Sequence, residues 1–515
     1  MQQLKSYLSG AWVSGTGRLA TLVNPATEEA VAETSSEGLD LKAALEYARA
    51  VGGPALRALT FGQRGALLQK IADLIYAHRD ELIECGVVNA GNTRGDAKFD
   101  VDGASATLHA YAELAKTLPD GPWLEDGEPV EIGSKRVSGR HVFVPLEGVA
   151  VHINAFNFPA WGMMEKAACA WLAGMPVLTK PATATSLMAH RLAELVVESD
   201  LLPAGTFSCL TGPASDLLQH VDERDVVAFT GSNDTGAWIR DIEHVRTKSV
   251  RLNVEADSLN AAVLGPDVTR GSETFDLFIG DVFRDMTQKA GQKCTAIRRV
   301  FVPESALEDV REALIERLEG LVIGDPAVDG VRMGPIANAS ALKSVQEGLA
   351  KLEQDAKVAW RGEGRFQVQD GNEGKGFFQP PTLLELATGQ DAPHVHSIEV
   401  FGPAATLIPY AEDEAAFAGV RRGGGGLVCS IYTDDRAFLK ASVNGVAASH
   451  GRLYLGSKKM AGGAPGPGMA LAPLQHGGPG RAGGGAELGG LRGVVHNMQR
   501  VALEGYGPLL DWLVK

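Results

Sequence analysis

The spacing of apolar positions changes along this 515-residue chain, and each pattern predicts its own elements. In the first 30 residues, short apolar runs stand between turn residues, which predicts short strands. From residue 41 to about residue 118, apolar positions recur at helical spacing, most clearly at Leu68, Ile71 and Ile75, with charges on the opposite face. The N-terminal part is therefore expected to form strands and then helices.

From residue 148 onward, short apolar runs alternate with helical patterns. The runs GVAVHINAF, PVLTK, TFSCLTG and VVAFTG predict strands, and helical patterns follow at about 161–174, at 185–200 and from 234. A second succession begins near residue 258, with strands at NAAVLG and RRVFVP and then a helix at ESALEDVREALIERLEGL. Short strands that alternate with helices are typical of a parallel sheet, so we predict an α/β protein.

Two segments fall outside this alternation. Residues 130–144 follow a polar stretch that contains glycine and proline, and they indicate a strand–turn–strand unit around Ser138 and Gly139. The chain after Gly423 is rich in glycine, and its pattern predicts no particular element.

Composition excludes several classes of function. The chain has 48 Lys and Arg against 63 Asp and Glu, a net charge of −15, which disfavours binding to nucleic acid or anionic membranes. The most apolar stretch, 167–179, is too short to span a bilayer, and the N-terminus shows no secretory signal. The five cysteines are scattered without CxxC spacing, so neither disulfides nor a metal site are expected. We expect a cytoplasmic protein.

Three loops follow predicted strands, at the edge where open parallel sheets bind ligands. The segment 229–236, FTGSNDTG, opens a helix whose free N–H groups suit a phosphate. Lys180 ends the strand PVLTK, where it can meet ribose hydroxyls or a phosphate, and the segment 154–159, NAFNFP, offers side-chain amides to an oxyanion. Taken singly, each also fits an ordinary turn or a solvated lysine.

Cys294 is the sharpest candidate for chemistry. It lies in KAGQKCT, on a glycine-bearing turn. A cysteine near a helix N-terminus with Lys293 beside it is expected to have a lowered pKa and to act as a thiolate nucleophile. The alternative is a small, buried, inert cysteine, which is the commoner role of lone cysteines.

Taken together and in this order, these segments resemble the NAD(P)-dependent aldehyde dehydrogenase superfamily. The resemblance rests on NPATEE, NAFNFP, LTKPA, FTGSNDTG, GQKC and EVFGP, which span nearly the whole chain. It implies two Rossmann-like, doubly wound parallel-sheet domains and a β-strand arm that bridges subunits, in a homodimer. The implied division is 1–128 and 147–258 for the NADP-binding domain, 259–475 for the catalytic domain, and 129–146 and 491–515 for the bridging segments.

The resemblance also implies roles for single residues. Cys294 corresponds to the nucleophile, and Asn157 to the side chain that holds the oxyanion together with the Cys294 backbone N–H. Glu487 corresponds to a proton-relay glutamate, although a solvated loop carboxylate is an equal alternative. The implied cofactor-binding residues are Asn154, Ala155, Phe156, Lys180, Ala182, Thr183, Gly212, Thr230, Gly231, Ser232, Glu399 and Phe401.

The general base departs from the family pattern. The family's usual glutamate position falls here on Asn253, and the nearest glutamate, Glu255, stands two positions further on. We expect Glu255 to be the base, because the stretch around it and the segment HGGPGRAGGGAELGGLRG resemble a subgroup with the same displaced glutamate. If Glu255 is only structural, no hydrolytic base remains, and transfer of the thioester to coenzyme A (CoA) becomes the alternative.

The same subgroup indicates the substrate, and the residue at position 183 indicates the cofactor. The subgroup oxidises CoA-linked semialdehydes in the degradation of aromatic compounds, so a CoA-linked aldehyde is the expected substrate, with another small semialdehyde as an alternative. NAD-preferring members often carry a glutamate where this chain has Thr183, beside Lys180. A neutral hydroxyl and a cation favour a 2′-phosphate, so NADP is expected, with NAD as a weaker possibility.

Overall fold

The computed structural model describes residues 1–514 and contains two large sheets. The strands predicted from residue 148 onward form the first of them. Five parallel strands stand in the order β13-β12-β9-β10-β11, and the N-terminal strands β2 and β3 extend the sheet antiparallel. The strands are β9 (Ala150–Ile153), β10 (Val177–Lys180), β11 (Phe207–Cys209), β12 (Val226–Thr230), β13 (Arg251–Glu255), β2 (Ser6–Leu8) and β3 (Ala11–Val13). A small sheet of β1 (Gln2–Leu4), β5 (Ala30–Thr34) and β4 (Ala20–Val23) lies beside them.

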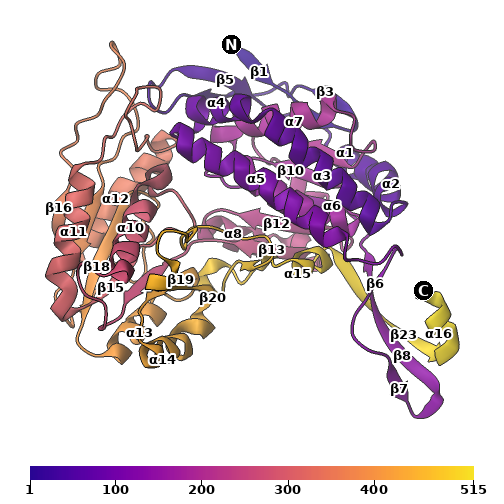
Figure 1. The fold of residues 1–515 in the computed structure, drawn as a ribbon. Helices are drawn as coiled ribbons and strands as arrows, with labels where there is room; N and C mark the ends of the chain where they lie inside the picture. Colours follow the sequence, from indigo (N-terminus) through magenta and orange to yellow (C-terminus); the bar gives the residue numbers. More distant parts are fainter. Residues whose placement is uncertain (515) are drawn as a thin grey trace.

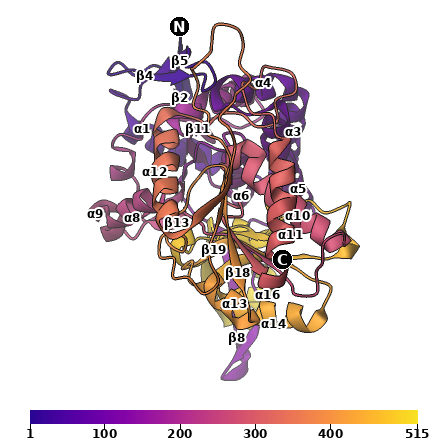
Figure 2. The same cartoon turned by 90° about the vertical axis from the view of Figure 1, so that its left-hand side faces the viewer.

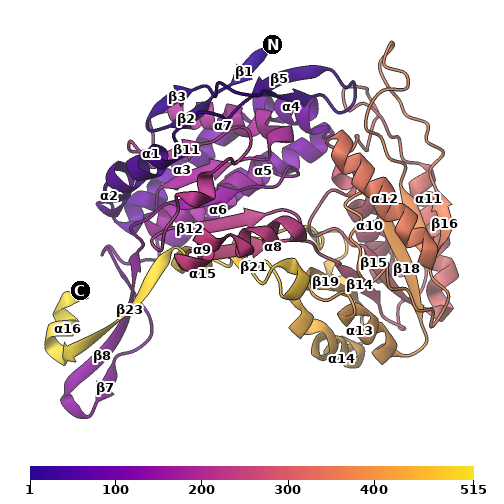
Figure 3. The same ribbon diagram turned by 180° about the vertical axis from the view of Figure 1, so that it is seen from behind.

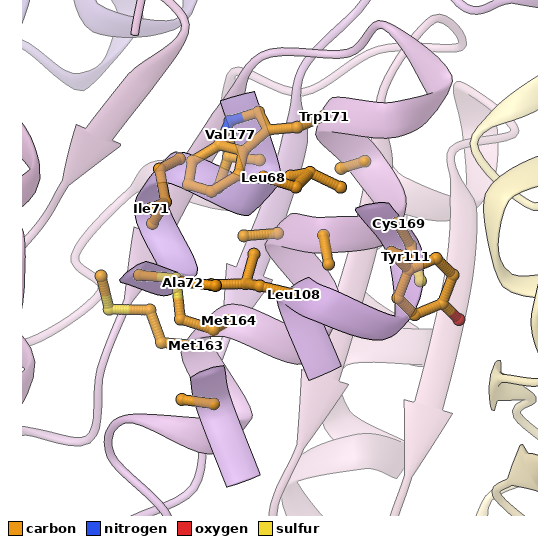
Figure 4. Close-up of a cluster of buried hydrophobic side chains, with 14 of the residues drawn as sticks. Leu68, Ile71, Ala72, Leu108, Tyr111, Met163, Met164, Cys169, Trp171 and Val177 are labelled. Atoms are coloured by element: carbon orange, nitrogen blue, oxygen red, sulfur yellow. The ribbon is translucent and has the colours of Figure 1, made fainter. Parts of the chain in front are cut away.

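Helices bury the first sheet and build its core. Figure 4 shows part of this core, where Leu68 and Ile71 of one helix, Leu108 of a second and Trp171 of a third come together. All four side chains are fully buried or nearly so. The helices of this lobe are α1 (Leu41–Tyr47), α2 (Gly53–Arg57), α3 (Phe61–Ala77), α4 (Arg79–Ala90), α5 (Arg94–Ala115), α6 (Trp161–Ala173), α7 (Ser186–Glu198), α8 (Asn233–Asp241) and α9 (Glu243–Thr247).

The second succession forms its own seven-stranded sheet. Its order is β16-β17-β18-β15-β14-β19-β20, parallel except for β16, and helix α12 lies on one side of it with α10 and α11 on the other (Figure 2). The strands are β14 (Ala261–Leu264), β15 (Arg299–Pro303), β16 (Lys357–Arg361), β17 (Thr382–Glu385), β18 (Ala404–Tyr410), β19 (Gly426–Tyr432) and β20 (His450–Gly456). The helices are α10 (Glu273–Thr287), α11 (Leu307–Glu319), α12 (Ala339–Asp355), α13 (Asp413–Arg421) and α14 (Arg436–Val446). Two parallel-sheet units confirm the predicted α/β class.

The glycine-rich tail returns to the first lobe. After β20 the chain forms the short pair β21 (Gln475–His476) and β22 (Glu487–Leu488) and then helix α15 (Leu491–Val495). Leu488, Val494 and Met498 belong to the hydrophobic core of the first lobe. The tail therefore crosses from one lobe to the other, a path that its sequence pattern did not predict.

A separate arm projects from the first lobe (Figures 1 and 3). It consists of β6 (Leu124–Glu125), β7 (Val130–Ile132), β8 (Ser134–Pro145), β23 (Met498–Tyr506) and helix α16 (Gly507–Leu513). The predicted turn at Ser138 and Gly139 is wrong, because both lie inside β8 and the hairpin turns at Gly133, where φ is +67°. Gly133 tolerates that left-handed conformation because glycine has no Cβ. Gly139 is part of the strand and faces Ile132 across the hairpin.

The helical region predicted from residue 41 to about residue 118 is interrupted, among other places, between α3 and α4. Helix α3 ends at Ala77, His78 leaves the helical conformation at φ −103° and ψ 18°, and α4 begins at Arg79. No helix of residues 1–514 is long and apolar enough to cross a membrane.

Candidate active site

Strand order reverses in the first sheet between β9 and β12, the position where such sheets bind ligands. Asn154 follows β9 directly, and Thr230 ends β12. Gly231 and Ser232 come next, and Ser232 is the N-cap of α8, accepting a hydrogen bond from the Thr235 backbone N–H. The sheet thus presents an open helix N-terminus beside polar strand ends.

Cys294 lies in a tightly held turn before β15. Lys289, Ala290 and Gly291 all have positive φ, between 52° and 70°, and a side chain on Gly291 would lie 2.2 Å from the Gly402 carbonyl oxygen. The amide of Asn260 donates to the carbonyl of Cys294 at 2.7 Å and to that of Ala296 at 2.9 Å. This strained backbone fixes the position of the thiol.

The electrostatic setting of Cys294 differs from the expectation. Cys294 stands in a turn and not at a helix N-terminus, and the ammonium of the buried Lys293 pairs with Asp285 at 2.6 Å. Burial of the thiol and the charge of Glu255 raise the pKa of Cys294 well above its ordinary value. The expected lowering of the pKa by Lys293 is therefore wrong, because that lysine's charge is already neutralised.

Glu255 lies beside the nucleophile. It is the last residue of β13, is fully buried, and one of its carboxylate oxygens lies within 4.8 Å of Cys294 Sγ. Among the described residues, its Oε1 has no polar partner, whereas its Oε2 lies 3.1 Å from Nε2 of His476. Burial would raise the pKa of Glu255, but the positive charges of His476 and Lys166 outweigh it and keep the pKa below its usual range.

His476 lies beside Glu255 and Cys294, and its sequence context did not predict this position. It ends β21, and its Nε2 lies 3.1 Å from Glu255 Oε2 and 3.9 Å from Cys294 Sγ. Burial would lower its pKa, but the charge of Glu255 raises it to about 9. The only signal was that His476 begins the glycine-rich segment already singled out for its resemblance.

Asn157 lines the same cavity as Cys294 and Glu255. Its side-chain amide donates to the carbonyl of Gln292 at 3.0 Å, two residues before the nucleophile. Gln292 is in turn fixed, because its side-chain carbonyl accepts a hydrogen bond from Ala337 N–H at 3.0 Å. The amide is thus held next to the reacting thiol.

Behind Glu255, a second buried group connects the tail to the sheet. Asn253 donates to Glu487 at 3.1 Å, and Lys166 pairs with Glu487 at 3.1 Å and with Glu165 at 3.3 Å. Burial raises the pKa of Glu487 to about 7 despite the charge of Lys166. Glu487 is buried, so the alternative of a solvated loop carboxylate is wrong. Asn253, at the family's usual position for the base, contacts Glu487 and not Cys294.

Lys180 is suited to an anionic ligand. It ends β10, is largely buried, and burial alone lowers its pKa to about 8. Among residues 1–514 no carboxylate pairs with it. Ala182 and Thr183 follow at the start of a short 3-10 helix. A buried cation without a partner at the ligand-binding edge fits the phosphate and ribose groups of a dinucleotide.

The remaining predicted cofactor residues surround that edge. Phe156 and Phe401 pack edge to face at 5.7 Å, and Ala155 lines the cavity of Cys294. Glu399 accepts from Ser258 N–H at 3.0 Å, and burial raises its pKa to about 7. Gly212 follows β11 with φ +93°.

The structure thus gathers some of the predicted residues in one cavity and spreads the others. Ala155, Asn157, Thr230, Glu255 and Cys294 line a cavity of about 40 Å³. A larger, mainly apolar cavity of about 570 Å³ adjoins it, because Trp161 and Ala470 line both. Lys180, Thr183, Gly212, Glu399 and Phe401 line neither of these two cavities.

Comparison with known proteins agrees with this geometry. Residues 12–461 match the model of the aldehyde dehydrogenase family. The chain is 46% identical over 478 residues to the 3,4-dehydroadipyl-CoA semialdehyde dehydrogenase of Aromatoleum evansii, covering 93% of each chain. It is 27% identical to the NADP(+) succinate-semialdehyde dehydrogenase of Escherichia coli K12, covering 84% of this chain and 85% of the relative.

Solved structures share the fold. The lactaldehyde dehydrogenase of Escherichia coli superposes with a TM-score of 0.84 at 24% identity, covering 98% of this chain and 99% of that one. A betaine aldehyde dehydrogenase from Staphylococcus aureus, solved with NAD+, gives 0.83 at 22% identity, covering 98% of both chains. Together with the family match over most of its length, these findings establish that the chain belongs to the aldehyde dehydrogenase family.

Proposed function

We propose that this enzyme oxidises a CoA-linked semialdehyde, 3,4-dehydroadipyl-CoA semialdehyde or a near analogue, to the carboxylic acid with NADP. The observation that carries the proposal is the convergence of Cys294, Glu255 and Asn157 on one cavity. The relative from Aromatoleum evansii, named for that substrate, supports the choice of aldehyde.

The chemistry follows from the three side chains. Sulfur of Cys294 attacks the aldehyde carbon, the thiol proton leaves to the adjacent Glu255, and the oxygen becomes an oxyanion beside the Asn157 amide. Bound NADP would supply the acceptor for the hydride that this thiohemiacetal must lose to become a thioester of Cys294. Water would then cleave the carbon–sulfur bond to give the acid and the free thiol.

Glu255 supports hydrolysis over transfer to CoA. Among the described residues, its buried Oε1 has no polar partner and its Oε2 pairs with His476, and one of these oxygens lies within 4.8 Å of the sulfur that would carry the thioester. A water held there loses its proton to the carboxylate as it attacks. Transfer to CoA needs no such base, so a buried, ionised glutamate at this point would be an unexplained cost.

Glu487 and Lys166 offer a route for the proton away from the site. Lys166 lines both the cavity of Cys294 and the neighbouring cavity that contains Glu487. Because burial brings the pKa of Glu487 to about 7, this carboxyl can both accept and release a proton near neutrality. We therefore assign Glu487 to proton transfer and Glu255 to the activation of water.

The strand ends support NADP as the cofactor. Lys180 and Ser232 would hold phosphate groups, and Glu399 the ribose next to the nicotinamide. At the adenosine ribose, Lys180 presents a partnerless cation and Thr183 a neutral hydroxyl, so a 2′-phosphate meets attraction and no like charge. NAD lacks that phosphate and gains less from the cation.

The large cavity supports a long, partly apolar substrate. Its lining includes Phe99, Trp161 and Leu471, with Lys98 and Asp102 as its charged members. An unsaturated acyl chain fits between such side chains, and the aldehyde at its end would reach the small cavity that holds Cys294.

The two lobes and the arm support the remaining assignments. We assign residues 1–128 and 147–258 to cofactor binding, 259–475 to catalysis, and the arm to pairing of two subunits in a homodimer. Exposed apolar side chains on the arm, such as Tyr506, Leu509 and Trp512, are suited to cover by a second copy.

The test is a comparison of substrates by kcat/KM. The enzyme is supplied with NADP and CoA-linked or free semialdehydes, with and without free CoA. The proposal expects the CoA-linked semialdehyde to have the highest kcat/KM, a carboxylic acid as product, and no need for free CoA. Turnover that depends on free CoA would overturn hydrolysis, and equal rates with short free aldehydes would overturn the substrate assignment.

A further inference from the structure

Three side chains of different chemistry converge on one point in the catalytic cavity. Cys294, His476 and Glu255 each offer one donor atom, and these three atoms all lie within 4.8 Å of one another. The Nε2 atom of His476 is 3.1 Å from Glu255 and 3.9 Å from the sulfur. Thiolate, imidazole and carboxylate are the three ligand types that Zn²⁺ prefers in proteins.

The spacing of the donor atoms matches a tetrahedral ion. With Zn–S near about 2.3 Å and Zn–N and Zn–O near about 2.0 Å, tetrahedral donors stand about 3.3 to 3.6 Å apart. The separations of His476 Nε2 from Glu255 and from the sulfur, 3.1 and 3.9 Å, lie within about half an ångström of that range, and the separation of Glu255 from the sulfur is at most 4.8 Å. Rotation of the Glu255 and Cys294 side chains would bring all three donors onto one ion. The three residues leave a fourth position open toward the cavity, as in zinc sites that keep an exchangeable ligand.

The surrounding charge favours a cation. Glu255, Glu165 and Glu487 are three buried or nearly buried carboxylates, and Lys166 lies among them, paired with Glu165 and Glu487. When His476 is neutral and Cys294 is a thiolate, the cluster has a net negative charge that a divalent ion neutralises. Both oxygens of Glu255 are buried, and among the described residues Oε1 has no polar partner.

We propose that Cys294, His476 and Glu255 form an inhibitory binding site for Zn²⁺ in the free enzyme. The ion replaces the proton of the Cys294 thiol and the proton that His476 holds beside Glu255, so binding at neutral pH releases up to two protons. It occupies the nucleophile and the base together. Neither attack on the aldehyde nor activation of water is then available.

The site exists only while the sulfur is free. A thioester sulfur carries no negative charge and is a poor zinc ligand, so the acyl-enzyme does not bind the ion in this way. Zinc is therefore expected to compete with the aldehyde and not with NADP. The effect on turnover rests on the proposed function, whereas metal binding can be measured without it.

The experiment measures binding of Zn²⁺ and Co²⁺ to the metal-free enzyme without cofactor or aldehyde. A chromophoric chelator reports zinc stoichiometry and affinity, and Co²⁺ reports a thiolate ligand by its charge-transfer absorption. We expect one ion per chain, a thiolate–cobalt band, and proton release in calorimetry with buffers of different ionisation enthalpy.

Variants identify the ligands. His476→Gln, Cys294→Ser and Glu255→Gln should each weaken zinc binding by about 100-fold or more, because even loss of an outer partner typically costs about 10- to 100-fold. Cys85→Ser is the matched control, because Cys85 is the other cysteine that is not fully buried, and it should bind zinc like the wild type. Circular dichroism before each titration restricts the comparison to folded variants.

Three results would overturn the proposal. One is the absence of stoichiometric binding at micromolar zinc, and another is binding that persists unchanged in folded His476→Gln and Cys294→Ser. The third is loss of binding in Cys85→Ser alone. Failure of the proposed substrate in turnover assays would leave the binding result unaffected, so the two proposals fail separately.

Discussion

At the scale of single residues, the site depends on charges that burial has shifted. Glu255 is held ionised next to a thiol that is itself held protonated, and His476 lies within reach of both. With a carboxylate beside a neutral thiol, the proton moves from sulfur to carboxylate as the sulfur attacks the aldehyde. The resting enzyme therefore need not store a reactive thiolate.

This arrangement predicts the pH dependence of alkylation. Burial and the charge of Glu255 raise the pKa of Cys294 above its ordinary value, so the thiolate fraction should keep growing as pH rises past about 9. The rate of iodoacetamide modification of Cys294 in the cofactor-free enzyme, mapped by mass spectrometry, should increase throughout pH 6 to 9. A plateau below pH 8 would show a preformed thiolate, and Cys294→Ala controls for other sites.

Cofactor choice is a second property of single residues. Thr183→Glu should move preference from NADP toward NAD, because a carboxylate facing the 2′-phosphate adds repulsion of about 1–3 kcal/mol in a partly desolvated site. Lys180→Ala should weaken NADP more than NAD. The measurement is the ratio of kcat/KM for the two cofactors in each variant, and an unchanged ratio in both would mean that neither side chain contacts the ribose.

At the scale of elements, helix α5 lines the larger cavity, which we assign to the substrate. Gly103 on α5 faces Trp161 so closely that an added Cβ would lie 2.2 Å from the indole ring. Trp161 lines both cavities, so a shift of its ring changes the path to Cys294. We therefore expect that position 103 must be glycine for Trp161 to keep its place between the two cavities.

Gly103→Ala should raise KM for a CoA-linked semialdehyde several-fold and change KM for a short free aldehyde much less, because only the long substrate fills the larger cavity. Gly62→Ala on helix α3 is the control, since Gly62 lines neither cavity and its added Cβ would meet only Thr60 Oγ1 at 3.8 Å. KM values for both substrates in both variants decide the matter. Equal changes for the two aldehydes in Gly103→Ala would argue against the channel.

Much of the fold could be predicted because its signals are local. Apolar runs predicted β9, β10, β11, β12, β14 and β15, and the motif segments pointed to Asn157 and Cys294 on loops and to Glu255 at the end of β13, although β13 and the strands after β15 were not predicted. His476 could not be found in this way, because it reaches the site through the pairing of β21 with β22 in a tail without periodicity. The expected lowering of the pKa of Cys294 was wrong for a similar reason. Asp285, which neutralises Lys293, lies on a different element, α10.

At the scale of the whole molecule, the site is assembled between two lobes. Glu255 comes from the first sheet, Cys294 from the loop before β15 in the second, and His476 from the tail that returns to the first lobe. Any relative motion of the two lobes would therefore change the distance between Cys294 and Glu255.

The arm makes a prediction about assembly. Trp512 is 72% exposed and Tyr506 58% exposed, so Trp512→Glu with Tyr506→Glu should shift the enzyme from dimer toward monomer in light scattering after gel filtration. Tyr76→Glu, an exposed aromatic on α3 away from the arm, is the control and should leave the mass unchanged. A wild-type protein that is monomeric at micromolar concentration would contradict the role of the arm.

In the proposed mechanism, Cys294 carries a thioester that Glu255 helps water to cleave. Glu255→Gln keeps the size of the side chain but cannot accept the proton of water, which should slow deacylation by about 10²- to 10⁴-fold.

The most direct measurement follows this variant in the first turnover, with rapid-mixing absorbance for NADPH and intact-protein mass for the adduct. We expect a burst of about one NADPH per active site, slower if Glu255 also deprotonates the thiol, then a slow steady state with the acyl group on Cys294. Cys294→Ala should give neither burst nor adduct while it still binds NADP. A steady-state rate like that of the wild type, with no accumulated acyl-enzyme, would exclude Glu255 as the base that activates water.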